Sequence, residues 1–337
     1  MASTRYTIFG VYLLTVLAVL ASLCSVTLAN LGEDGRPGYL YTGRSRGFRA
    51  HVSLPIRRRY GSAQYPASDS YRARLSVGSR SQEPERTVLD AELSNEEQIL
   101  LRNHMSSLQW AEVYALARPW TMVSNPNLGF IYNQVLRVNK EGVEGDIMEL
   151  GVWKGGASMV MLFAEIRSGD AANPRTAWLF DTFQGLPPPT VEDDEKSKQA
   201  WSKVVAGTAS KQKIRHVEDG KWCYGPKAIV KNNIRSTGYP LTHIRMVEGK
   251  VEDSLPVTNL PENIAVLRLD TDWYKSTRIE LDLLWDRLSP GGILYVDDYC
   301  AWGGARKATD EFFEERGLSH LLNQYKAKKP CLYIVKP

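Results

Sequence analysis

Residues 264–277 read Ile264-Ala-Val-Leu-Arg-Leu-Asp-Thr-Asp-Trp-Tyr-Lys-Ser-Thr277, and residues 291–299 read Gly291-Gly-Ile-Leu-Tyr-Val-Asp-Asp-Tyr299. Each stretch is a short apolar run that ends in carboxylates, which is typical of a buried strand. The carboxyl ends of parallel strands meet at one edge of a sheet, and ligands bind there. The two runs therefore predict four carboxylates at one edge of one sheet: Asp270, Asp272, Asp297 and Asp298.

Four carboxylates at one edge repel one another unless a cation lies among them. Oxygen ligands suit a hard cation such as Mg²⁺, which keeps open positions for water or substrate. A simpler alternative is that Asp297 and Asp298 cap the following helix and that Asp270 is an ordinary strand-end residue. Two such strand ends in one chain favour the metal site.

The rest of the chain after residue 145 alternates between strands and helices, which indicates a doubly wound α/β sheet with a Rossmann-like arrangement. The predicted strands cover 146–151, 176–181, 243–248, 263–270 and 292–297. The predicted helices between and after them cover 155–167, 224–236, 276–288 and 306–316. Two helices are expected before the sheet, at 94–118 and 127–140, and two short strands after it, near 318–325 and 331–335. Residues 185–222 form a long charged insertion.

Residues 146–158 read Asp146-Ile-Met-Glu-Leu-Gly-Val-Trp-Lys-Gly-Gly-Ala-Ser158, a strand followed by a glycine-rich turn and a helix start. Glycines let the backbone approach a ligand, and a helix N-terminus offers free N–H groups. The turn is not GxGxxG, and Glu149 would repel a phosphate, which favours a cationic ligand such as S-adenosylmethionine (SAM). Asp181 ends the next strand and can accept both ribose hydroxyls of SAM or of a dinucleotide. Tight helix–strand packing alone is the alternative for the glycines.

The N-terminal part of the chain differs in composition from the rest. Residues 6–29 carry no charge and are long enough to span a bilayer, so residues 1–30 are expected to be a signal anchor or a cleavable signal peptide. Residues 31–86 are rich in Arg and Ser and are expected to be a disordered linker. Residues 1–86 contain 12 Arg, no Lys and five acidic residues, whereas the whole chain has a net charge of +4.

This asymmetry leaves the remainder of the chain mildly acidic, which argues against nucleic-acid binding. We expect a membrane-anchored protein or one of the secretory pathway, Golgi-type or organellar, with the side of the membrane left open. The chain has four cysteines without CxxC spacing, so neither a disulfide framework nor a zinc site is expected.

Five motifs follow one another along the chain: ELGVWKGGA at 149–157, FDTFQGLP at 180–187, VEDSLP at 251–256, LDTDWYKST at 269–277 and GGILYVDDY at 291–299. In this order they resemble the macrocin O-methyltransferase (TylF-type) family over about residues 94–337. These are class I enzymes that depend on SAM and Mg²⁺ and methylate sugar hydroxyls of antibiotics and related glycosides. The resemblance implies a SAM-dependent methyltransferase domain over residues 87–337.

The resemblance also implies site residues. Asp270, Asp297 and Asp298 would hold the metal, and Asp272 would be the general base. Cofactor contacts are implied at Met122, Ser124, Glu149, Gly151, Gly155, Gly156, Asp181, Phe183 and Gly249. The chain departs from the family in its longer insertion and at Val251, where an aromatic residue is usual; both concern the acceptor and the adenine rather than the chemistry.

Several alternatives stay open. His104, His216 and His243 are the other candidate bases, and His216 is the strongest because it lies in the insertion. Trp153, Trp222 and Trp273 could stack on a ligand or pack in the core. The acceptor is expected to be a small glycoside or glycan, but a catechol or another vicinal diol would suit the same metal chemistry. A non-catalytic SAM-binding protein, a nucleotide-dependent oxidoreductase and a homo-oligomer are further possibilities.

Overall fold

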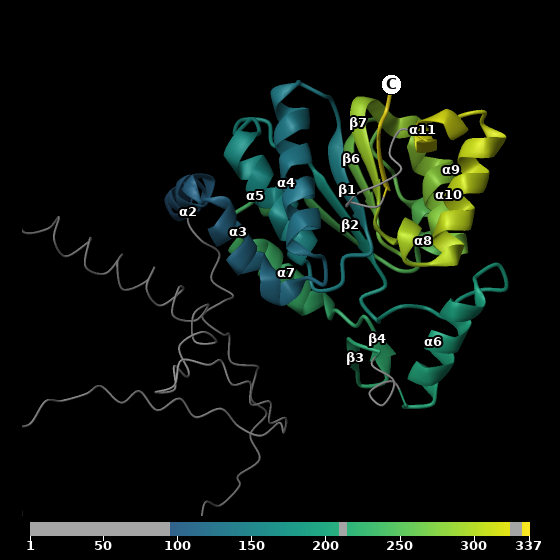
Figure 1. Cartoon of the computed structure of the whole chain (residues 1–337). Coiled ribbons are helices and arrows are strands. Elements are labelled where there is room, and N and C mark those ends of the chain that lie inside the picture. The colour runs from purple at the N-terminus through teal and green to yellow at the C-terminus, as the bar shows by residue number, and fades with distance from the viewer. Residues whose placement is uncertain (1–94, 209–213, 324–331) are drawn as a thin grey trace, which may run out of the picture. The chain divides into compact units, whose positions relative to one another are not determined.

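A parallel sheet lies at the centre of the residues that the computed structural model describes, which are 95–208, 214–323 and 332–337 (Figure 1). Its strand order is β5-β2-β1-β6-β7-β8, and β8 alone runs antiparallel to its neighbour. The strands are β1 (Asp146–Leu150), β2 (Ala177–Asp181), β5 (Ile244–Glu248), β6 (Ile264–Leu269), β7 (Leu288–Val296) and β8 (Leu332–Val335). The predicted doubly wound α/β fold is therefore confirmed.

Helices cover both faces of this sheet (Figure 1). One face carries α2 (Asn95–Ser107), α3 (Trp110–Ala117), α4 (Asn125–Lys140), α5 (Gly156–Ser168) and α7 (Lys227–Ser236). The other carries α8 (Val251–Ser254), α9 (Tyr274–Leu284), α10 (Gly303–Glu315) and α11 (Ser319–Asn323). All six residues of β6 are buried between the two layers. Each buried aliphatic side chain contributes about 1.5–3 kcal/mol, so the central strands are held rigidly beneath the edge where the predicted site lies.

Two predicted elements need correction. A single helix was expected over 94–118, but it breaks after Ser107 because Ser106 and Ser107 bond back to carbonyls of the same helix. The next helix, α3, is capped by Gln109, whose backbone N–H donates to the Glu112 carboxylate at 2.7 Å. A strand was expected near 318–325, but the described part of this segment is the short helix α11.

The insertion after Gly185 is folded where it is described. It contains α6 (Glu195–Val205) and a two-stranded hairpin of β3 (Val217–Glu218) and β4 (Lys221–Trp222). Asp193 accepts a hydrogen bond from the Tyr274 N–H at the start of α9, 2.8 Å away. Asp194 accepts one from the Gly303 N–H at the start of α10, 3.0 Å away. Carboxylates suit the positive ends of helices, so these contacts fix the insertion next to the carboxyl edge of the sheet.

The predicted membrane segment at 6–29 and the predicted linker at 31–86 lie outside the described residues. Within the described residues, no helix combines the length and the hydrophobicity that crossing a bilayer requires. Cys300 is disulfide-bonded, whereas Cys223 is a free cysteine. The sequence argument against a disulfide framework did not anticipate this bond.

Candidate active site

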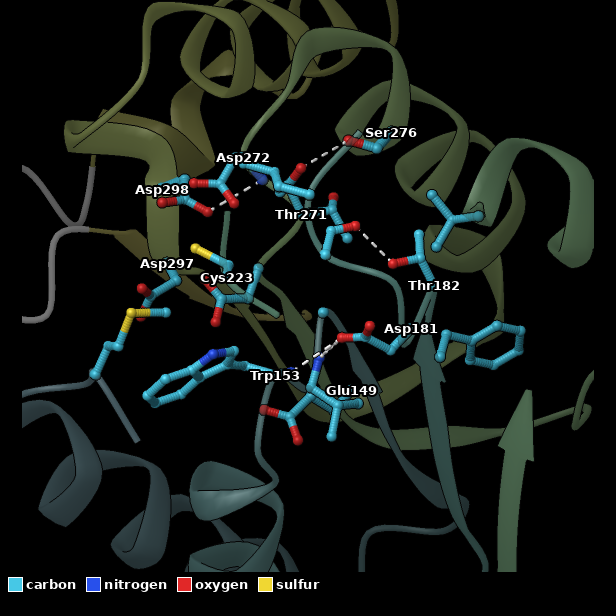
Figure 2. Close-up of a pocket in the computed structure, with 18 of the residues that line it drawn as sticks. Glu149, Trp153, Asp181, Thr182, Cys223, Thr271, Asp272, Ser276, Asp297 and Asp298 are labelled. Carbon is cyan, nitrogen blue, oxygen red and sulfur yellow. Dashed lines mark hydrogen bonds between the residues drawn. The ribbon is translucent and has the colours of Figure 1, made fainter. Parts of the chain in front are cut away.

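A cavity of about 350 Å³ opens at the carboxyl edge of the sheet, where the strand order reverses between β1 and β6. Its volume is within the range of small-molecule pockets. Carboxylates stand on two sides of it: Glu149 and Asp181 on one, and Asp272, Asp297 and Asp298 on the other (Figure 2). The predicted site residues among its lining are Met122, Glu149, Gly151, Asp181, Gly249, Asp270, Asp272, Asp297 and Asp298.

Three of these aspartates form one group. Asp270 follows β6, and Asp297 and Asp298 follow β7, so parallel pairing of the two strands brings their ends together. One carboxylate oxygen from each lies within 4.8 Å of the others. All three donors are oxygens, as Mg²⁺ prefers. Asp297 Oδ1 is buried and has no hydrogen-bond partner in the described chain, so the donor set fits a divalent cation.

Asp272 lies beside this group with an unusual backbone conformation. Its φ of 67° is in the left-handed region, which costs free energy for any residue other than glycine. Its N–H donates to Asp298 Oδ2 at 3.2 Å, which keeps the two side chains together (Figure 2). Burial, reinforced by the negative charge of Asp297, raises the pKa of Asp272 to about 7. A carboxylate with such a pKa can take up a proton near neutral pH.

The raised pKa values predict that the metal-free protein loses stability as the pH rises. Burial raises the pKa of Asp272 to about 7 and holds those of Asp270 and Asp298 well above the ordinary value, so the folded protein keeps protons at pH values where the unfolded chain has released them. This stabilising contribution is fully present only below about pH 4, where the unfolded carboxyls are also protonated. It declines as the pH rises further, and the share of Asp272 is lost once the pH passes about 7. With a chelator present, the Tm should fall between pH 5 and pH 8, and Asp272→Asn should flatten this decline. A Tm that rises over that interval would contradict the assignment.

The cofactor end of the cavity is built around Glu149. Its side chain is fully buried and accepts hydrogen bonds from Ser158 Oγ and from Arg268 Nη1, the latter at 2.7 Å. Gly151 comes directly after the strand that carries Glu149 and has a φ of 86°, and a Cβ there would lie 1.9 Å from the carbonyl oxygen of Asp270. Only glycine fits this close approach.

Asp181 holds the glycine-rich turn. Its Oδ2 accepts the N–H groups of Val152 and Trp153 at 2.7 and 2.9 Å, and its Oδ1 accepts that of Phe183 at 2.6 Å. The sequence predicted that Asp181 would accept ribose hydroxyls. Its carboxylate also shapes the backbone on which a ligand would lie.

Four predicted cofactor residues are not part of the cavity lining. Ser124 is exposed at the start of α4, although Met122 of the same segment lines the cavity. Gly155 and Gly156 start α5, and a Cβ on Gly156 would lie 2.6 Å from the Trp120 backbone, which indicates a packing role. The Phe183 side chain is buried in the core.

The structure also shows which of the other candidate bases and stacking residues line the cavity. His216 lines the cavity with its ring 5.1 Å from that of Trp153, and burial lowers the pKa of the His216 imidazole. His104 and His243 are not part of the lining. Trp273 packs against Trp222 and Trp302, and its Nε1 donates to the Pro187 carbonyl at 2.7 Å, so it seals the insertion. Trp153 lines the cavity.

Arg268 is a site residue that the sequence argument missed. Its side chain is 1% exposed, and it forms ion pairs with Glu149, Asp270 and Asp297 at 2.7, 2.8 and 3.2 Å. The signal was present in the sequence, because a charged residue inside an apolar strand is seldom buried without partners. The cation that the clustered carboxylates require is thus supplied in part by the chain itself.

Comparison with known proteins shows the family to which a chain with this site belongs. A family model described as macrocin-O-methyltransferase (TylF) matches residues 115–329, which include the strand ends and all the carboxylates of the cavity. The chain belongs to this family. As a macrocin O-methyltransferase family member it is an O-methyltransferase, and its family and fold support SAM as the methyl donor.

Named relatives agree with the family. Mycinamicin III 3''-O-methyltransferase of Micromonospora griseorubida is 32% identical over 200 residues, which are 59% of this chain and 72% of the relative. The 8-demethyl-8-(2,3-dimethoxy-alpha-L-rhamnosyl)-tetracenomycin-C 4'-O-methyltransferase of Streptomyces olivaceus is 31% identical over 219 residues, 64% and 77% of the two chains. The solved structure of the O-methyltransferase NovP matches with a TM-score of 0.53 and 23% identity over 71% of this chain and 99% of NovP, which supports the class I methyltransferase fold.

Proposed function

We propose that this macrocin O-methyltransferase family member transfers a methyl group from SAM to a hydroxyl of a sugar in a glycoside. Asp272 serves as the general base, and Asp270, Asp297 and Asp298 hold Mg²⁺. The observation that carries the proposal is the group of three ligand oxygens within 4.8 Å, beside Asp272 in the cavity that Glu149 also lines. The name of the Streptomyces olivaceus relative, which includes a rhamnosyl group, supports a sugar acceptor.

The reaction breaks the methyl–sulfur bond of SAM and forms a methyl–oxygen bond, which leaves S-adenosylhomocysteine. An aliphatic hydroxyl must lose its proton during this transfer, and Asp272 accepts that proton. A bound Mg²⁺ would orient two neighbouring hydroxyls and lower the pKa of the reacting one. Both substrates are held at one sheet edge, so their proximity supplies much of the remaining rate enhancement. The negative Glu149 suits the cationic cofactor at the other end of the cavity.

The test is calorimetric titration of the full-length protein with SAM, with and without Mg²⁺, and with NAD as a control, followed by assays on pooled glycosides and catechols. We expect SAM to bind, NAD not to bind, and Mg²⁺ to be required for transfer to glycosides. Transfer only to catechols would move the acceptor to the vicinal diol class. Binding of NAD in place of SAM would overturn the proposal. The membrane or secretory location stays a prediction from residues 1–86.

A further inference from the structure

Strand pairing places three polar side chains in one row across the middle of the sheet. Glu149 of β1 pairs in register with Arg268 of β6, and Arg268 pairs with Tyr295 of β7. Side chains two residues apart on a strand point to the same face. The next row on this face, at the strand ends, therefore consists of Gly151, Asp270 and Asp297. The row of Glu149, Arg268 and Tyr295 lies directly beneath the cofactor turn and two of the metal ligands.

Arg268 connects the two ends of the site through its terminal nitrogens. Its Nη1 lies 2.7 Å from Glu149 Oε1 and 2.8 Å from Asp270 Oδ2. Its Nη2 forms an ion pair with Asp297 Oδ1 at 3.2 Å, but neither of these two buried atoms has a hydrogen-bond partner in the described chain. The Tyr295 ring supports the guanidinium from the side, with its centroid 5.8 Å from Arg268 Cζ.

One buried cation thus stands between an acidic cofactor pocket and an acidic metal site. A planar guanidinium can hold several carboxylates in fixed orientations, whereas mobile carboxylates of like charge would turn away from one another. Carboxylates that bind metals are themselves oriented by hydrogen bonds, and such partners commonly set metal affinity. Asp270 has one oxygen bonded to Arg268, which leaves its other oxygen for a ligand.

We propose that Arg268 is a positioning residue for both ends of the site: it orients Glu149 toward the cofactor and Asp270 and Asp297 toward the metal. This inference rests on the proposed function. It makes SAM affinity and Mg²⁺ affinity depend on the same side chain, although the two ligands bind at different strand ends.

The test compares Arg268→Met and Arg268→Lys with Arg175→Met in the full-length protein. Arg175 is a matched control because its guanidinium is also largely buried and bonds to Asn139, Glu165 and the Val143 carbonyl, away from the cavity lining. Each protein is titrated calorimetrically with Mg²⁺ alone and with SAM alone, and its Tm is recorded. Arg268→Met removes the guanidinium that holds the carboxylates at both ends of the site. We therefore expect it to weaken both affinities by about 10–100-fold.

Arg268→Lys keeps the charge and the fold but loses the fork that reaches Asp297, so we expect a smaller loss for both ligands. Arg175→Met should lower the Tm and leave both affinities unchanged. Wild-type affinities in the two Arg268 variants, with a lower Tm only, would reduce Arg268 to a packing residue and overturn the inference. Tighter Mg²⁺ binding would also overturn it, because Arg268 would then compete with the metal. Absence of SAM or Mg²⁺ binding in the wild type would instead overturn the proposed function.

Discussion

Asp272→Asn should lose about 10²–10⁴-fold in kcat, the usual contribution of a general base, while SAM binding stays intact. Asparagine removes the proton acceptor but tolerates the left-handed conformation of position 272, where φ is 67°. The N–H that bonds to Asp298 is also retained. The loss should therefore appear in turnover rather than in the fold. Initial rates and calorimetry on the same preparation measure the two quantities.

Asp282→Asn is the matched control, because Asp282 lies on the exposed side of α9, where it pairs with Arg278. That variant should behave as the wild type in both measurements. Full turnover in Asp272→Asn would remove Asp272 from the role of base, and His216, which lines the same cavity, would become the candidate. A His216→Gln variant would then be expected to show the loss.

Asp297→Asn should raise the Mg²⁺ concentration needed for half-maximal activity about 100-fold or more, because it removes a metal ligand and even the loss of a ligand's hydrogen-bond partner costs 10–100-fold in affinity. Of the three aspartates, Asp297 can be substituted with the least disturbance of other contacts. Asp298 also accepts the Asp272 N–H, and Asp270 pairs with Arg268 at 2.8 Å. Asp297 pairs with Arg268 at the longer distance of 3.2 Å, and its Oδ1 has no hydrogen-bond partner in the described chain. Activity at rising Mg²⁺ concentrations, after treatment with a chelator, measures the effect.

Glu315→Gln, on the exposed surface of α10, should leave the Mg²⁺ dependence unchanged. Wild-type activity that survives complete removal of divalent cations would show that the three aspartates serve another purpose. An unchanged Mg²⁺ requirement in Asp297→Asn would show that the cation binds without Asp297.

The parts of the site that the sequence predicted share one property: each belongs to a short apolar run with a polar end. This pattern identifies buried strands in a sequence, and parallel pairing then brings the ends of the strands together, as with Asp270 and Asp297. Arg268 was missed because its role depends on which strands are neighbours. The register that sets it beside Glu149 appears only once β1 and β6 are paired.

Local hydrogen bonds and the directions of side chains explain the other incorrect predictions. The hydrophobic period continues from α2 into α3, but hydroxyl groups of Ser106 and Ser107 that bond back to the helix end it early. The position of Phe183 could not be told from its motif, because a motif fixes the order of residues and not the direction of a side chain. The structure buries this ring in the hydrophobic core.

The attachment of the insertion has a consequence for how the enzyme could diversify. Asp193 and Asp194 fasten it to two helix starts, and the adjacent Gly303 and Gly304 leave room for their carboxylates. These contacts are separate from the two strand ends that carry Asp270, Asp297 and Asp298. Residues 195–221 could therefore be exchanged between related enzymes as a cassette, with acceptor preference passing to the chimera and the methyl-transfer machinery left in place.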